Sequence, residues 1–80
     1  MSKTHRLKPV LVLAIQYSGT SENIRDLEAH FGQAESVWEH CIRIAGCALL
    51  KGQWLVRFLD TGEIKVYSNE VFQLRFEVVT

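Results

Sequence analysis

The sequence predicts an α+β fold: a small, mainly antiparallel sheet of four to five strands with one packed helix and one short C-terminal helix. Three observations indicate this fold. Eighty residues suffice for one domain, which we place over residues 1–80. Residues 51–79 alternate between extended apolar patterns and turn residues, with a short capped helical segment among them. Residues 21–31 carry apolar side chains at the three- and four-residue spacing of an amphipathic helix.

The first predicted element is a strand near the start of the chain. All residues from Val10 to Ile15 are apolar, a pattern typical of a strand that is covered on both faces. The pattern therefore predicts a central strand or a strand at an interface. After a polar break, Ser21 has a side chain that caps helices, and Gly32 has the conformational freedom to end one. We expect the packed helix between them, over residues 21–31.

Residues 36–45 fit two patterns. Trp38, His40, Ile42 and Ile44 alternate as they would on one face of a strand, whereas Trp38, Ile42 and Ala45 have helical spacing. β-Branched residues lose rotamer freedom in a helix, and the glycine at position 46 would weaken a helix interior. We therefore predict a strand, with a helix as the alternative.

A β-hairpin is predicted after residue 53. Trp54, Val56 and Phe58 share one face of its first strand, and Arg57 lies on the other face. The Asp-Thr-Gly sequence at residues 60–62 suits a tight turn, after which residues 63–67 return as the second strand.

The hairpin is followed by a short helix and a closing strand. Ser68 can cap a helix over residues 68–74. We expect Val71, Phe72 and Leu74 to point from this helix to a core. Residues 76–79 are then expected to complete the sheet as its final strand.

Composition and charge exclude several classes of protein. Nine basic residues balance nine acidic ones, so no overall field draws the chain onto a nucleic acid or an anionic membrane. The apolar run near the start is too short to span a membrane, and no small-residue cleavage site follows it. We therefore expect a cytoplasmic protein that does not bind membranes. A homodimer is a further expectation, because little net charge keeps copies apart. Cys41 and Cys47, the only cysteines, are expected to be reduced and buried.

Several short motifs lie in order along nearly the whole chain. They are Lys8-Pro9-Val10, Ala14-Ile15-Gln16-Tyr17-x-Gly19, Gly52-Gln53-Trp54-Leu55-Val56, Gly62-Glu63, and Phe72 followed by Phe76-Glu77. In this order they resemble a family of small proteins encoded by bacteriophages and prophages. The family usually reads Pro-Gly-Asp where this chain has Lys51, Gly52 and Gln53, so the chain departs from the family at that corner. The resemblance implies a phage origin and a fold, and it leaves the mechanism open because the family is mostly without an assigned activity.

No set of ionisable side chains in the sequence predicts catalysis. His40, Cys41 and Cys47 have neither the number nor the spacing of zinc ligands, and adjacent strand residues point to opposite faces. Asp60 and Glu63 flank a turn, where acidic residues serve turn geometry and solubility. We therefore expect a protein that is not an enzyme and that holds no metal and no cofactor.

Binding is the remaining class of function. The chain has eight aromatic residues and a strand that is apolar on both faces, which is a large apolar surface for eighty residues to bury. Surplus apolar area commonly marks a partner site. Small phage proteins of this kind usually act on the host, so we predict binding to a host bacterial protein, for host takeover or for inhibition of a defence. The expected partner-binding residues are of types that dominate interfaces: Trp54, Arg57, Tyr67, Tyr17 and Lys65.

Two alternatives stay open at this point. Basic residues in the leading arm and near Trp54 and Tyr67 suit the binding of single-stranded nucleic acid, although the balanced charge lacks the usual electrostatic footprint. The second alternative is a sponge for a defence signalling nucleotide. It would need a dimer cleft that is lined by arginine and aromatic residues.

Overall fold

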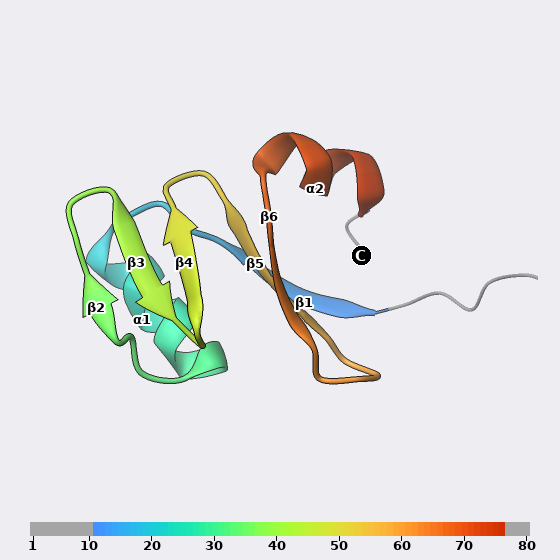
Figure 1. Ribbon diagram of the computed structural model, residues 1–80, viewed down its shortest axis with the longest axis horizontal. Coiled ribbons are helices and arrows are strands. Elements are labelled where there is room, and N and C mark those ends of the chain that lie inside the picture. The colour runs from blue at the N-terminus through green and yellow to red at the C-terminus, as the bar shows by residue number, and fades with distance from the viewer. Residues whose placement is uncertain (1–10, 77–80) are drawn as a thin grey trace, which may run out of the picture.

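The computed structural model describes residues 11–76, and these residues form the α+β fold that the sequence predicts (Figure 1). The fold contains two antiparallel sheets of three strands and one helix that packs against them through one face, and a short helix follows the last strand. The elements in chain order are β1 (Val12–Gln16), α1 (Ser21–Phe31), β2 (Ser36–Val37), β3 (Cys41–Ile44), β4 (Cys47–Leu50), β5 (Trp54–Phe58), β6 (Ile64–Tyr67) and α2 (Asn69–Arg75).

The strands are divided between two sheets, where the sequence predicts one sheet of four to five strands. Sheet A has the order β1-β5-β6, and sheet B has the order β2-β3-β4. The reason is that both edges of β5 are occupied, by β1 on one side and β6 on the other. β4 precedes β5 along the chain but has no free edge of β5 to pair with, so it pairs with β3 alone.

Helix α1 spans the predicted residues. Its N-cap is Thr20, one residue before the expected Ser21, and the Thr20 hydroxyl accepts a hydrogen bond from the backbone N–H of Asn23. Gly32 ends the helix with a φ of 96°, a conformation that glycine adopts readily. The helix turns Leu27 fully into the core.

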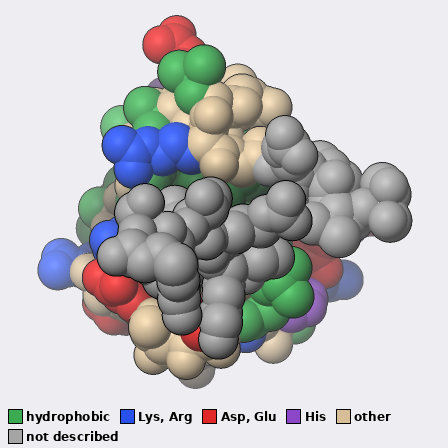
Figure 2. Space-filling view, turned by 90° about the vertical axis from the view of Figure 1, so that its right-hand side faces the viewer, with side chains coloured by type: hydrophobic (Ala, Val, Ile, Leu, Met, Phe, Trp, Pro, Cys, Tyr) green, Lys and Arg blue, Asp and Glu red, His purple; other side chains and the backbone are tan. Residues whose placement is uncertain are grey.

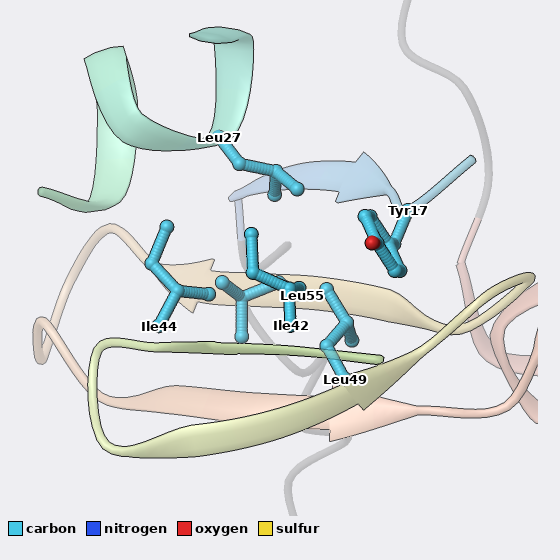
Figure 3. Close-up of a cluster of buried hydrophobic side chains, with 6 residues drawn as sticks. All are labelled: Tyr17, Leu27, Ile42, Ile44, Leu49 and Leu55. Carbon is cyan, nitrogen blue, oxygen red and sulfur yellow. The ribbon is translucent and has the colours of Figure 1, made fainter. Parts of the chain in front are cut away.

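One cluster of buried side chains joins the helix to both sheets (Figure 3). Leu27 projects from α1 toward side chains from the strands and from the residue that follows β1. Burial of aliphatic and aromatic side chains on this scale is the main stabilising contribution in a domain of this size. The cluster comprises Tyr17, Leu27, Ile42, Ile44, Leu49 and Leu55.

Residues 36–45 contain strands and no helix, as predicted, but they form two strands, β2 and β3, instead of one. β2 ends at Val37 and pairs back on β3, with Val37 opposite Ile42. The chain therefore reverses at residues 38–41, where the Trp38 N–H donates to the Cys41 carbonyl over 2.8 Å. Because of this reversal Trp38 and His40 do not share a strand face with Ile42, and both are exposed.

β1 is an edge strand. It pairs with β5 alone in the described part of the chain, so the prediction of a central strand is wrong. Every residue of β1 is half-buried.

Helix α2 covers the face of sheet A that is turned away from α1. The Ser68 hydroxyl accepts from the N–H of Val71 and caps the helix as predicted. Only Phe72 is buried; Val71 is 37% and Leu74 is 87% exposed, so the expectation that all three point to a core is wrong for two of them. The predicted closing strand begins at Phe76, which is the C-cap of α2, and its other residues lie outside the described range.

No helix within residues 11–76 has the length and apolar character needed to cross a membrane.

Candidate protein-binding surface

The aromatic residues near Trp54 form a cluster between sheet A and α2, which we call the aromatic cluster. The pairing of β5 with β6 places Trp54 opposite Tyr67, on the same face as Phe58. Trp54 stacks on Phe72 of α2, with ring centroids 3.9 Å apart and planes 7° from parallel. Phe76 contacts three of the other rings, and its centroid lies 5.3 Å from that of Tyr67. The cluster comprises Trp54, Phe58, Tyr67, Phe72 and Phe76.

Trp54 and Tyr67, two of the predicted partner-binding residues, therefore contribute to the attachment of α2. The Trp54 indole N–H donates to Oδ1 of Asn69 over 2.9 Å, so its polar atom also has an internal partner. Both side chains are half-buried. A partner would reach only the parts of these rings that α2 leaves uncovered.

Arg57 points to the opposite face of sheet A, as the sequence predicts. Its Nη1 donates to the carbonyl oxygen of His30 over 2.8 Å, and its guanidinium carbon lies 5.4 Å from the centroid of the Phe31 ring. A cation at the C-terminal end of a helix satisfies a free carbonyl and interacts favourably with the helix dipole. Arg57 thus fixes the end of α1 to β5.

Tyr17 and Lys65 lie in opposite environments. Tyr17 is 1% exposed and belongs to the core, so it does not offer a surface that a partner could contact. Burial, and after it the nearby Cys41, raises the pKa of the Tyr17 phenol above its ordinary value of 10.0. Lys65 is exposed, with Nζ 3.5 Å from Oε1 of Glu63 and 5.7 Å from the centroid of the Phe58 ring. Of the five predicted residues, only Lys65 is an exposed one.

His40, Cys41 and Cys47 are not gathered into a metal-binding group in the described range. His40 is exposed, and Cys41 and Cys47 are half-buried free thiols, so the expectation that both cysteines are buried is wrong. Among residues 11–76 no group of three or more His, Cys, Asp or Glu side chains lies close enough to hold a metal ion. Asp60 accepts a hydrogen bond from the N–H of Thr61 in the exposed turn after β5.

A row of three apolar side chains, the outer two of which are exposed, crosses the end of sheet B. Cys41 lies opposite Leu50 in the pairing of β3 with β4, and the hydrogen bond from Trp38 to Cys41 extends the pairing of β2 with β3 by one residue. Residues that lie opposite one another across antiparallel strands share a face. Trp38, Cys41 and Leu50 therefore share one face, and it is the outer one because Ile42 and Leu49 point to the core. We call these three residues the Trp38 row.

The Trp38 row has the composition of an interface centre. Trp38 is 54% and Leu50 is 52% exposed. Polar groups surround the row: the His40 ring lies 3.7 Å from the Glu39 carboxylate, and Arg43 Nε lies 3.5 Å from the Glu35 carboxylate. An apolar centre that contains tryptophan and is bordered by polar residues is typical of protein–protein interfaces.

The sequence patterns missed Trp38 because they assigned it to the same strand face as Ile42 and Ile44. The reversal after Trp38 contains neither glycine nor proline, the residues that most often mark a turn. The only local signal is the pair of polar residues, Glu39 and His40, that interrupts the apolar alternation. That signal is weak, since polar residues also occupy the solvent face of a strand.

Charge gives little support to a nucleic-acid surface. Figure 2 shows that basic and acidic side chains are interspersed on the visible part of the face that carries α2. Hydrophobic side chains also reach the surface at the top of that view, where α2 lies. Nucleic-acid binding surfaces are usually a basic stripe or patch.

No protein-family model, curated protein or solved structure matches this chain. The geometry described above is therefore the basis for assigning a function.

Proposed function

We propose that this protein is a non-enzymatic binding module whose Trp38 row recognises a host bacterial protein in the bacterial cytoplasm during phage infection. The supporting observation is the exposure of Trp38, 54% of whose surface is open to solvent beside Leu50 and Cys41. A tryptophan costs free energy when it is left in water, and a partner that covers it regains that free energy. The phage setting rests on the motifs that resemble phage-encoded proteins.

The chemistry of the row favours a protein as the partner. Phosphate groups would need basic side chains at the centre of the surface, but the three residues of the row are uncharged, and Arg43, which shares the outer face of β3 with Cys41, is paired with Glu35. Arginine and aromatic residues that could line a nucleotide cleft are engaged internally, Arg57 with α1 and Trp54 with α2. We therefore do not extend the proposal to nucleic acid or to a signalling nucleotide.

The test compares capture by the wild-type chain with capture by two variants. The tagged full-length protein is incubated with nuclease-treated bacterial lysate, and proteins that stay bound are identified and purified for affinity measurement. Trp38→Ser should weaken binding by about 30-fold or more, the size of effect typical of a tryptophan hot spot. Leu74→Ser is the matched control, since Leu74 is also exposed but lies on α2; it should change the affinity by less than about twofold.

Two results would contradict the proposal. One is a captured protein that binds the Trp38→Ser variant as tightly as it binds the wild type. The other is that the tagged protein retains only DNA or RNA from a lysate that has not been treated with nuclease. In the second case the affinity should fall steeply as salt is raised, because phosphate contacts release counterions.

A further inference from the structure

The outer edge of β1 carries backbone groups that have no partner in the described part of the chain. In an antiparallel pair, successive residues direct their N–H and C=O alternately toward and away from the neighbouring strand. The hydrogen bonds from the Tyr17 N–H to Gln53 and from Leu59 to the Leu11 carbonyl show that the odd-numbered residues face β5. Val12 and Ala14 therefore direct their N–H and C=O groups away from β5, to the open edge.

β1 also lacks the features that protect edge strands. Exposed edges are usually short, charged or interrupted by proline, because an open edge is a template for another strand. β2 has only two residues, and β6 carries Lys65. β1 has five residues, Val-Leu-Ala-Ile-Gln, without a charge or a proline, and all are half-buried although no strand within residues 11–76 covers their edge.

We propose that two copies of this chain pair β1 with β1, antiparallel, about a two-fold axis at Leu13. In this register Val12 of one copy lies opposite Ala14 of the second copy. Each such pair exchanges two backbone hydrogen bonds, so the two symmetric pairs satisfy the outward N–H and C=O groups of Val12 and Ala14 in both copies. The two copies of sheet A become one continuous sheet of six strands, three from each copy.

The register also agrees with the contacts at the ends of β1. The Gln16 carbonyl points to the same open edge, but it accepts a hydrogen bond from Asn23 Nδ2 over 2.7 Å. An axis at Leu13 leaves that bond in place, because it does not require the Gln16 carbonyl. Leu13 then meets Leu13 of the second copy in a non-hydrogen-bonded pair, where side chains approach most closely.

A second copy fits this edge better than an unrelated strand for two reasons. Under the two-fold axis the residues Val12, Leu13 and Ala14 meet only one another, so the backbone groups are satisfied and no charged side chains are placed opposite each other. The formal net charge of the chain is zero, so two copies approach without long-range repulsion. This inference does not rest on the proposed function, because the Trp38 row lies in sheet B.

The first test measures the mass of the full-length protein in solution by analytical ultracentrifugation over a range of concentrations. The wild type should be a dimer at high concentration. Ala14→Pro should be a monomer, because it removes an outward N–H from each copy and places a ring at the edge. Its pairing with β5 should persist, since that pairing uses the odd-numbered residues, and circular dichroism should confirm the fold. Trp38→Ser should remain a dimer.

The second test fixes the register through a disulfide and does not depend on the proline variant. In a Cys41→Ser, Cys47→Ser background, Leu13→Cys places two thiols across the axis. Their Cα atoms are then about 4.5 Å apart, within the range of about 4.4–6.8 Å that disulfides span. Leu11→Cys is the control at an exposed residue, because its two copies would be offset by four residues, about 13 Å. Only Leu13→Cys should form a covalent dimer on mild oxidation.

Three outcomes would overturn the proposal. They are a wild type that stays monomeric at all concentrations, an Ala14→Pro variant that is folded and dimeric, and a Leu11→Cys variant that is cross-linked as fast as Leu13→Cys. A monomeric wild type would leave the edge of β1 to water, to a partner protein or to a terminal segment of the same chain.

Discussion

The indole N–H of Trp54 donates a hydrogen bond to Oδ1 of Asn69 over 2.9 Å, which ties the first residue of β5 to the first residue of α2. The same oxygen lies 3.4 Å from Nε2 of Gln16, at the end of β1. One amide side chain thus accepts from two strands of sheet A. Together with the stacking of Trp54 on Phe72, this contact sets the position of α2 on the sheet.

We expect Asn69→Ala to lower the free energy of unfolding by about 0.5–1.5 kcal/mol, the usual net value of a hydrogen bond. The low end applies if water replaces the lost acceptor, because Asn69 is exposed. The measurement is urea denaturation followed by circular dichroism. Gln73→Ala is the control, since its amide lies 3.5 Å from the same oxygen, at the limit of a hydrogen bond. An Asn69→Ala variant no less stable than Gln73→Ala would show that the contact contributes nothing.

Arg57 is expected to stabilise the protein through the end of α1. Arg57→Ala removes the hydrogen bond to the His30 carbonyl and the contact with the Phe31 ring, and it should cost about 1–2 kcal/mol. Arg57→Lys retains the charge but lacks the planar guanidinium group, so it should recover less than half of the loss. Amide hydrogen exchange should rise in the last turn of α1 and stay unchanged in β3. Equal stability of the lysine variant and the wild type would contradict this role.

Tyr17 should make the protein less stable at alkaline pH. Its pKa is raised in the folded state by burial and, to a lesser extent, by Cys41, so the unfolded chain loses the phenol proton first as the pH rises. The contribution of the protonated Tyr17 phenol to the free energy of unfolding is complete below pH 10. It is lost as the pH rises through 10 toward the pKa of the folded state. Melting temperatures between pH 8 and 11 should therefore fall more steeply for the wild type than for Tyr17→Phe. Parallel curves for the two proteins would exclude this linkage.

Local sequence signals were sufficient to predict those parts of the fold in which a single residue type determines a backbone feature. Gly32 ends α1, and Ser68 caps α2, as the sequence predicts. The alternation after Trp54 also gives the correct faces of β5, because the side-chain period of a strand depends on neither partner nor sheet. These features are short-range, and a single sequence contains them.

The division into two sheets and the candidate surface required information that local patterns lack. β5 pairs with β1, some forty positions earlier along the chain, and a choice of partner over that distance depends on the whole core. The aromatic residues expected on the surface are largely turned inward because α2 folds back over them. Trp38 became a surface residue through a chain reversal that no glycine or proline marks. The sequence therefore predicted a binding function, but it assigned that function to residues other than those of the Trp38 row.

The turn between β3 and β4 offers the clearest test of local backbone strain. Ala45 and Gly46 form this two-residue connection, with φ values of 53° and 74°. Positive φ at both positions is typical of a type I′ turn, in which asparagine followed by glycine is the preferred sequence. Alanine adopts this conformation at a cost, because its Cβ crowds the backbone, whereas asparagine tolerates it. The sequence therefore carries an avoidable strain at Ala45.

We expect Ala45→Asn to raise the free energy of unfolding by about 0.5–1 kcal/mol, measured by urea denaturation. Gly46→Ala is the matched opposite change and should lower it by about 1 kcal/mol or more. A Cβ atom at Gly46 would meet nothing within 4 Å, so any loss in that variant comes from the backbone conformation and not from a steric clash. If both variants unfold at the same urea concentration as the wild type, the turn is free to adopt another conformation, and its positive φ angles do not limit the stability of sheet B.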